Sequence, residues 1–198
     1  MTQAVPRPSL IVILCGPSGA GKSTVMSRLV ARHSNWHAVE SYTTREERKE
    51  ESPVKPYRFV SVEQFMSLVK SGDIVEYEKY AGNWYGTSAE SLEAARQRAP
   101  VVLMDLQLKG VEALKERYPD ALDIYLRVSL GEVRRRLMSD WRRAGTPQVE
   151  MLSRLASVAR QNRRARKFTA VVDSIPGDIT ATVKAVEATI LSRLKPAK

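Results

Sequence analysis

Residues 14–24 read LCGPSGAGKST and directly follow a short apolar run. Within them, Gly16, Gly21, Lys22 and Ser23 fit the pattern G-x-x-x-x-G-K-[ST]. A buried strand is predicted before this stretch, and the following VMSRLVARH is typical of a helix. Glycines let backbone N–H groups approach phosphate oxygens at a helix N-terminus, which itself favours anions. The stretch therefore predicts the phosphate-binding loop of an α/β protein.

The chemistry of such a loop assigns roles to two of its side chains. Lys22 reaches the β and γ phosphates of a nucleoside triphosphate, and the Ser23 hydroxyl binds Mg²⁺. A second acid is expected beside the loop, and Asp105 ends the apolar run PVVLMD, where it can hold the metal through a water. Ser23 and Asp105 are thus the predicted metal residues. The predicted ATP-binding residues are Gly16, Ser18, Gly19, Ala20, Gly21, Lys22, Ser23 and Thr24, with Arg136 from a later basic segment.

Composition narrows the class of protein. The chain has 198 residues, 43% hydrophobic and 27% charged, which is ordinary for a single globular domain. Its longest apolar stretch is far shorter than the roughly 20 residues that cross a bilayer, and its start lacks signal-peptide features. The single cysteine, Cys15, allows no intramolecular disulfide. We expect no membrane partner and a cytoplasmic location.

The chain alternates short apolar runs with amphipathic stretches, which indicates α/β architecture with a central parallel sheet flanked by helices. Residues 37–86 interrupt this alternation with short strands and turns, which predicts a separate β-rich lobe. The predicted buried strands are 9–15, 100–105, 122–128 and 168–174. Three S/T-x-x-E/Q capping boxes mark helix starts: Ser61 with Gln64, Thr87 with Glu90, and Ser129 with Glu132.

The β-rich insert carries groups suited to a second phosphorylated ligand. Arg45 and Arg48 are three residues apart, so both can grip one phosphate, and tyrosine hydroxyls such as those of Tyr57 and Tyr85 add neutral donors. The carboxylate of Glu76 suits guanine, because N1–H and the exocyclic amine of guanine are two donors on one edge. The insert therefore predicts the phosphate acceptor site.

With these motifs in hand, the sequence resembles the guanylate kinases from the loop to the C-terminal helix. The resemblance rests on motifs in matching order: GPSGAGKST, SYTTREER, YRFVS, GDIVEYEKYAGNWYGT, VVLMDLQLKGVEALK, LRVSLGEVRRRL and SRLASVAR. It implies a P-loop kinase that uses Mg²⁺ and ATP to phosphorylate GMP. It also implies one domain with a core (1–36, 87–137 and 164–198), a GMP-binding lobe (about 37–86) and a helical lid (about 138–163).

The resemblance implies residue roles as well. Four residues would hold the acceptor phosphate: Arg45, Arg48, Tyr57 and Tyr85. Guanine contacts would come from Ser41, Glu76 and Thr87, with Asp105 and Gln107 completing the acceptor site. The catalytic residues would be Lys22, Arg45, Arg143 and Arg154.

The sequence departs from the family pattern at several points. The family usually has D-x-D at the end of the strand, whereas this chain has Gln107 in place of the second acid, so one guanine contact loses its charge. The usual glycines after the TTRxxR element are missing between residues 50 and 56. The lid is longer, so either Arg142 or Arg143 reaches the triphosphate. Asp173 stands where an asparagine near adenine is common.

Three alternatives to a guanylate kinase remain open at this stage. Relatives of this fold in scaffold proteins bind peptides without catalysis, although a complete loop with Lys22 and Ser23 argues against that. The change at Gln107 leaves open a kinase for another acceptor, such as a ribose phosphate. The net charge of +10 favours anionic partners, but no recognised nucleic-acid module accompanies the basic segment at 127–167. The expected partners are ATP and GMP, for a monomer or a homodimer.

Overall fold

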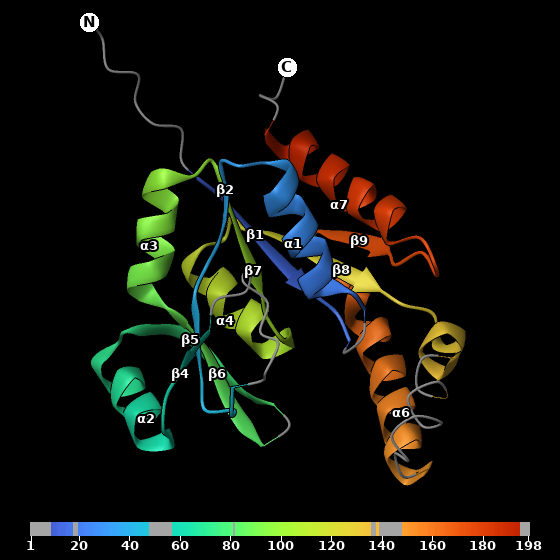
Figure 1. Ribbon diagram of the computed structural model, residues 1–198, viewed down its shortest axis with the longest axis horizontal. Coiled ribbons are helices and arrows are strands. Elements are labelled where there is room, and N and C mark those ends of the chain that lie inside the picture. Colours follow the sequence, from blue (N-terminus) through green and yellow to red (C-terminus); the bar gives the residue numbers. More distant parts are fainter. Residues whose placement is uncertain are drawn as a thin grey trace, which may run out of the picture.

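A five-stranded parallel sheet forms the centre of the protein, with strand order β2-β7-β1-β8-β9. Figure 1 shows this sheet in a computed structural model that describes residues 9–17, 20–47, 57–80, 82–135, 138 and 148–194. The strands of this sheet are β1 (Leu10–Cys15), β2 (Trp36–Ala38), β7 (Val101–Asp105), β8 (Leu122–Arg127) and β9 (Ala170–Asp173). The predicted class of α/β protein with a parallel central sheet is confirmed.

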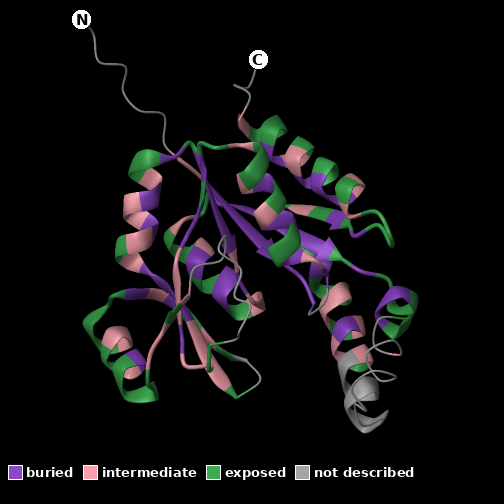
Figure 2. Cartoon of the chain, in the orientation of Figure 1, coloured by how far each residue is buried: buried purple, intermediate pink, exposed green. Residues whose placement is uncertain are grey.

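Helices cover both faces of this sheet, so its central strands are buried throughout (Figure 2). Successive side chains of β1 point to opposite faces of the sheet, so the hydrophobic core has two parts. Val12 and Leu14 join the cluster under α1 and α7, whereas Ile11 and Ile13 join the cluster under α3 and α4. This two-sided burial explains why the strands read as continuous apolar runs. The covering helices are α1 (Lys22–Arg32), α3 (Ala89–Arg98), α4 (Leu108–Arg117) and α7 (Ile179–Leu194).

The four strands predicted from apolar runs all exist, with ends that differ from the prediction by up to two residues. The parallel sheet also contains a fifth strand, β2, which pairs with β7. The β-rich lobe was expected to begin at about residue 37, which lies inside this strand. The boundary needs correction because β2 pairs with β7 and so belongs to the parallel sheet. This pairing leaves little trace in the sequence, since β2 has only three residues and β7 lies more than 60 residues further along the chain.

The β-rich lobe contains a separate four-stranded sheet with order β4-β3-β6-β5. Helix α2 (Val62–Ser71) covers one face of this sheet, where its fully buried Phe65 packs on Trp84 and Tyr77. On the opposite face of the sheet, α4 packs against β5. The strands of the lobe are β3 (Ser41–Thr43), β4 (Tyr57–Phe59), β5 (Ile74–Tyr80) and β6 (Asn83–Ser88).

Two of the three predicted capping boxes mark real helix starts. At α2, Ser61 and Gln64 form the complete reciprocal box. The backbone N–H of Glu132 donates to the Ser129 hydroxyl at the start of a helical segment. The prediction for Thr87 is wrong, because α3 is capped by the neighbouring Ser88, while the Thr87 hydroxyl donates to Glu76.

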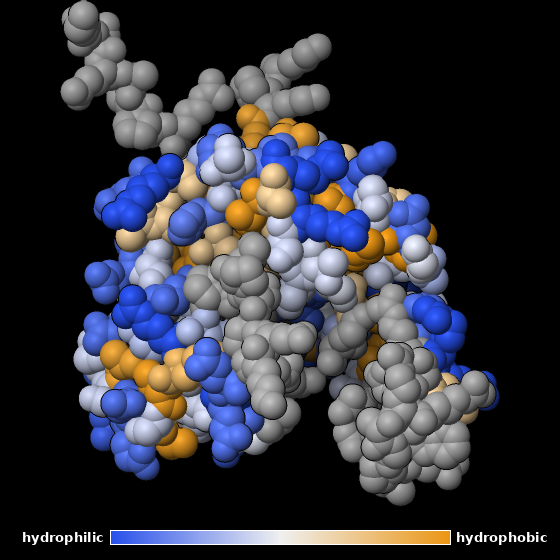
Figure 3. Space-filling model, in the orientation of Figure 1, coloured by the Kyte–Doolittle hydropathy of each residue, from blue (hydrophilic) through white to orange (hydrophobic). Residues whose placement is uncertain are grey.

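The predicted lid region is represented by α6 (Gln148–Arg164), which leads into the 3₁₀ turn η1 (Ala165–Lys167). In Figure 1 the lobe and α6 extend from the same side of the parallel sheet. Among the described residues, no helix is both long enough and apolar enough to cross a membrane. The surface seen in Figure 3 is mainly hydrophilic, with apolar side chains in small separate groups.

Candidate active site

The loop after β1 has the backbone that its glycines predict. Gly16 has φ of 146°, and a Cβ there would lie 2.5 Å from the Leu126 carbonyl oxygen. Gly21 has φ of 91° and precedes the first residue of α1, where no side chain caps the helix. The first N–H groups of α1 are therefore available for an anion. Ser18 and Gly19 lie outside the described residues.

Lys22 lies across this loop. Its Nζ donates to the carbonyl oxygens of Gly16 and Pro17 at 2.7 and 3.3 Å, and it lies 3.9 Å from Oδ1 of Asp105. The side chain is buried, with 8% of the residue exposed. The parallel pairing of β1 with β7 brings Asp105 opposite Leu14 and so beside the loop. The structure therefore brings together the predicted lysine and the predicted second acid.

The metal residues were predicted as Ser23 and Asp105. Ser23 lies in the first turn of α1 and is exposed, and Asp105 ends β7 close to Lys22. Within the part of the chain that the structure describes, no three His, Cys, Asp or Glu side chains are grouped as metal ligands. Mg²⁺ at phosphoryl-transfer sites takes few protein ligands and completes its coordination with waters and phosphate oxygens. A hydroxyl and one acid beside a phosphate loop fit that requirement.

Four of the predicted acceptor residues lie in one row across the lobe sheet. Ser41 on β3 is paired with Tyr57 on β4 and with Thr87 on β6, and Thr87 is paired with Glu76 on β5. Directly paired residues point to the same face of a sheet. Four residues that are far apart in sequence thus share the face opposite α2, which we call the acceptor face.

The next row on the acceptor face is formed by side chains two residues away along each strand. It contains Tyr85, whose ring meets that of Tyr57 edge-on with centroids 6.2 Å apart. The Arg45 guanidinium lies 5.2 Å from the ring centroids of both Tyr57 and Phe59. The Arg45 guanidinium and the Tyr57 phenol therefore lie at the β4 edge of this face, and the Tyr85 ring on β6 meets the Tyr57 ring, as expected for the phosphate end of an acceptor.

At the other edge of the acceptor face, Glu76 is deeply buried. The Thr87 hydroxyl donates to its Oε1 at 2.6 Å, but burial dominates and raises the pKa of Glu76 to about 7. The carboxylate packs against α4, where a Cβ on Gly110 would lie 3.2 Å from the Glu76 carboxyl carbon and still closer to Oε2. Gly110 therefore makes room for the Glu76 carboxylate.

Gln107 lies at the N-cap of the same helix, three residues before Gly110. Its side chain makes no capping hydrogen bond and is half-buried. Residues three apart share a helix face, so Gln107 lies on the side of α4 that meets β5. Asp173, which was related to the adenine site, forms a two-point ion pair with Arg127 at 2.6 and 2.7 Å.

Several predicted residues cannot be placed. Arg48, Arg136, Arg142 and Arg143 lie outside the described residues, as does the stretch between residues 50 and 56, and no side chain is described for Arg154. Sequence reasoning also missed two residues beside Glu76, namely Glu78 and Gly110. Strand alternation from Glu76 would have placed Glu78 on the acceptor face, but no local pattern relates Gly110 to Glu76.

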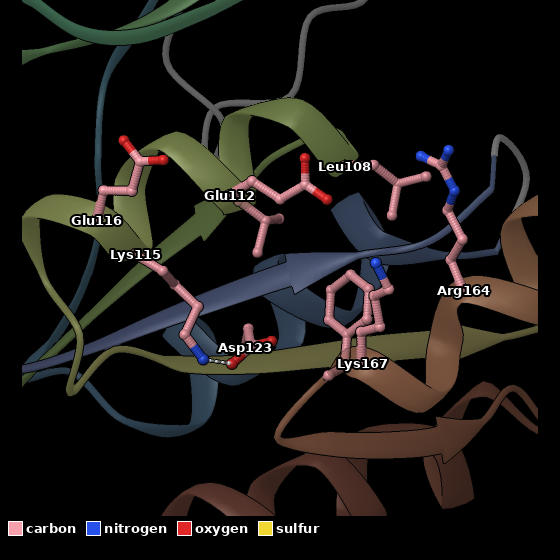
Figure 4. Close-up of a pocket in the computed structure, with 9 residues that line it drawn as sticks. Leu108, Glu112, Lys115, Glu116, Asp123, Arg164 and Lys167 are labelled. Carbon is pink, nitrogen blue, oxygen red and sulfur yellow. Dashed lines mark hydrogen bonds and ion pairs between the residues drawn. The ribbon is translucent and has the colours of Figure 1, made fainter.

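A cavity of about 370 Å³ lies between α4, β8 and η1. Figure 4 shows that Lys115 and Asp123 form an ion pair within it, with a Nζ–Oδ1 distance of 2.5 Å. Arg164 and Lys167 lie on the η1 side of this cavity. None of the predicted site residues lines it, so we assign neither substrate to this cavity.

Comparison with known proteins agrees with this geometry. The sequence model of the guanylate kinase family matches residues 9–193. A guanylate kinase of Thermosynechococcus vestitus is 32% identical over 193 residues, which cover 97% of this chain and 98% of that protein. A guanylate kinase of Bdellovibrio bacteriovorus is 34% identical over 159 residues, covering 80% of this chain and 84% of that protein.

A solved structure extends the likeness to three dimensions. The guanylate kinase of Anaplasma phagocytophilum superimposes with a TM-score of 0.73 at 25% identity, covering 96% of this chain and 88% of that chain. The matches span the parallel core and the lobe alike, as the family match over residues 9–193 also does. This chain belongs to the guanylate kinase family.

Proposed function

We propose that this chain catalyses ATP + GMP = ADP + GDP through the residues assigned below. The family match supports the reaction, and one observation carries the assignment of the acceptor site. Glu76, Thr87 and Ser41 form one row of the lobe sheet that ends at Tyr57, where Arg45 lies over the ring and the Tyr85 ring meets it from the next row. This order suits a ligand with a donor-bearing base at one end and a phosphate at the other.

On the donor side, the loop between β1 and α1 binds the triphosphate through its backbone N–H groups. Lys22 neutralises charge that develops on the transferred phosphoryl group, for which its Nζ must leave the carbonyls of Gly16 and Pro17. Ser23 and Asp105 are the residues that would hold Mg²⁺, which would offset the negative charge of the phosphates. Thr24 and Ala20 complete the loop.

On the acceptor side, Glu76 accepts from the guanine N–H groups, and Ser41 and Thr87 add hydroxyl groups. Arg45, Arg48, Tyr57 and Tyr85 hold the phosphate of GMP. This phosphate is already an anion, so its oxygen attacks the γ-phosphorus without a general base. Catalysis then rests on alignment and charge neutralisation.

The lid is proposed to supply the remaining positive charge. Arg136, Arg143 and Arg154 are the candidates to approach the triphosphate as the lid closes, and closure excludes water from the reacting phosphate. ATP and GMP act as small-molecule partners of a monomer or homodimer. The cytoplasm, where both nucleotides are abundant, is the expected location.

The deciding experiment is a coupled assay of ADP release with Mg-ATP and GMP, dGMP, AMP, UMP or no acceptor. We expect turnover with GMP and its loss by about 10³-fold in Lys22→Ala, because one preorganised cationic donor is removed. The Lys22→Ala protein must still bind GMP and unfold at the normal temperature. Turnover with a different acceptor, or none with folded protein that binds GMP, would overturn the proposed function.

A further inference from the structure

One carboxylate oxygen on the acceptor face has no partner. Among the side-chain atoms that the described residues bury, three make no hydrogen bond: Ser9 Oγ, Glu78 Oε2 and Arg96 Nε. Ser9 precedes β1, and Arg96 already donates to Glu93 through Nη1. Glu78 is the member of this set that lies on the acceptor face.

The position of Glu78 follows from the strand register. It lies two residues after Glu76 on β5, so both carboxylates point to the same face, and its partner on β6 is Tyr85. Burial is the main cause of the raised pKa of Glu76, but the charge of Glu78 adds to it. The charge of Glu78 also raises the pKa of Cys15, the last residue of β1. The Glu78 carboxylate therefore lies on the acceptor face, in the row next to that of Glu76.

The strand order separates this carboxylate from the Arg45 edge of the acceptor face. Glu78 is on β5, whereas Arg45 packs over the rings of Tyr57 and Phe59 on β4, at the opposite edge of the sheet. Three strand spacings amount to about 14 Å. Glu78 is thus far from Arg45, and although its cross-strand partner is Tyr85, its neighbour along β5 is Glu76, the residue assigned to the base.

The unpaired oxygen has a chemical requirement that a nucleoside meets. A buried acceptor without a donor costs about 1–3 kcal/mol, and such groups in native proteins call for a partner. GMP offers the 2′- and 3′-hydroxyls of its ribose and the N–H groups of guanine. The acid expected at position 107 is an amide in this chain, so Glu78 supplies a full negative charge on the same side of the site.

We propose that Glu78 is a specificity-determining residue whose carboxylate accepts a hydrogen bond from the nucleoside part of the acceptor. This proposal rests on the proposed function. Oε2 is buried but unpaired in the free protein, and the bound nucleoside provides its donor. Ribose hydroxyls and guanine N–H groups share this chemistry, and alternative acceptors distinguish them.

The test compares Glu78→Ala and Glu78→Gln with Glu90→Gln, which changes an exposed carboxylate in the first turn of α3. We expect Glu78→Ala to raise the KM for GMP about tenfold, corresponding to one lost hydrogen bond to a charged group. kcat and the KM for ATP should remain within twofold of the wild type. Glu90→Gln should leave all three constants unchanged.

Two further ligands identify the donor. If the 2′-hydroxyl donates, Glu78→Ala weakens GMP but not dGMP; if the exocyclic amine donates, it weakens GMP but not inosine monophosphate. A loss that persists with both ligands assigns N1–H or the 3′-hydroxyl. Direct titration of GMP supplies the same comparison without turnover.

Two results would overturn the proposal. One is an unchanged KM and Kd for GMP in Glu78→Ala; the other is a fall in kcat with KM unchanged. Removing an unpaired buried carboxylate should not lower the melting temperature. A lowered melting temperature of Glu78→Ala would therefore identify a misfolded variant, and the KM and Kd for GMP would then be compared in Glu78→Gln instead. Absence of GMP turnover in the wild type would instead refute the proposed function.

Discussion

The two sheets of this protein differ in how many of their faces are covered. The central strands of the parallel sheet are buried on both faces, because helices pack on each side (Figure 2). The lobe sheet has α2 on one face, and its other face, which α4 meets at Glu76, carries Ser41, Glu76, Thr87 and Tyr85. A face that carries polar side chains where the core sheet has apolar ones can hold groups for a ligand, at the expense of apolar burial.

Two buried carboxylates show the same difference. Asp123 in the core sheet is buried, which raises its pKa, but hydrogen bonds from Lys115 and Thr169 outweigh burial, so the pKa lies below its usual value. Glu76 in the lobe receives one hydroxyl, from Thr87, and burial raises its pKa to about 7. The core satisfies its buried charge internally, whereas the lobe keeps a carboxylate for the ligand.

The largest effect on folding should come from Gly16→Ala. A Cβ at this position meets the backbone carbonyl of Leu126, which cannot move without displacing β8, and φ of 146° is strained for alanine. We expect the free energy of unfolding to fall by about 3 kcal/mol. Urea unfolding measures it, and a loss below about 1 kcal/mol would show that the core is less rigid than its burial suggests.

Glu76→Gln tests the buried carboxylate through pH. Because the pKa of Glu76 is raised from 4.5 to about 7, the folded state binds the proton more tightly than the unfolded state. The free energy of unfolding therefore declines as pH rises from about 4.5 through about 7, by up to about 3 kcal/mol from this group. Glu76→Gln should remove this decline. The stability of the variant relative to the wild type should therefore be higher at pH 8 than at pH 5, and the variant should bind GMP more weakly.

The matched control for that measurement is Asp123→Asn in the core. The pKa of Asp123 is lowered, so its stabilising contribution is complete above its unfolded-state value and is lost only as pH falls through the folded value. Asp123→Asn should therefore lower stability equally at pH 5 and pH 8. Equal pH dependence in wild type and Glu76→Gln would refute the assignment of a raised pKa to Glu76.

Gly110→Ala should affect the ligand more than the fold. Its Cβ meets the end of the Glu76 side chain, which can move, unlike the backbone that opposes Gly16. We expect the KM for GMP to rise about tenfold, equivalent to about 1.4 kcal/mol, with stability changed by less than about 1 kcal/mol. Gly131→Ala is the control, because a Cβ there meets nothing within 4 Å. An unchanged KM would mean that Glu76 adapts without losing its contact.

The smallest effect is expected for Ser61→Ala, on the α2 side of the lobe. This change removes the hydroxyl that accepts from the Gln64 N–H in the capping box. Stability should fall by about 1 kcal/mol, with the KM for GMP unchanged, because α2 lies behind the acceptor face. Thermal unfolding measures the stability and a kinetic assay of the same protein measures the KM. A raised KM would indicate that α2 also sets the geometry of that face.

Local patterns predicted much of the fold. The strands around β1, the start of α1 and the capping box of α2 were all predicted, because each depends on residues within about ten positions of one another. The sequence did not predict that β2 joins the parallel sheet, nor that Ser88 caps α3 instead of Thr87. Both depend on pairing with distant strands, which fixes where one element ends and the next begins.

The sequence by itself determined the phosphate loop, since the glycines and Lys22 act within a few residues of one another and need only the strand before them and the helix after them. Only the tertiary structure decided which polar groups share the acceptor face. Ser41, Tyr57, Glu76 and Thr87 come from four strands, and a shift of one residue in any pairing would turn that strand's side chains to the face under α2. The contact of Gly110 with Glu76 has the same origin, because the packing of α4 against β5 depends on the whole sheet order and on no local signal.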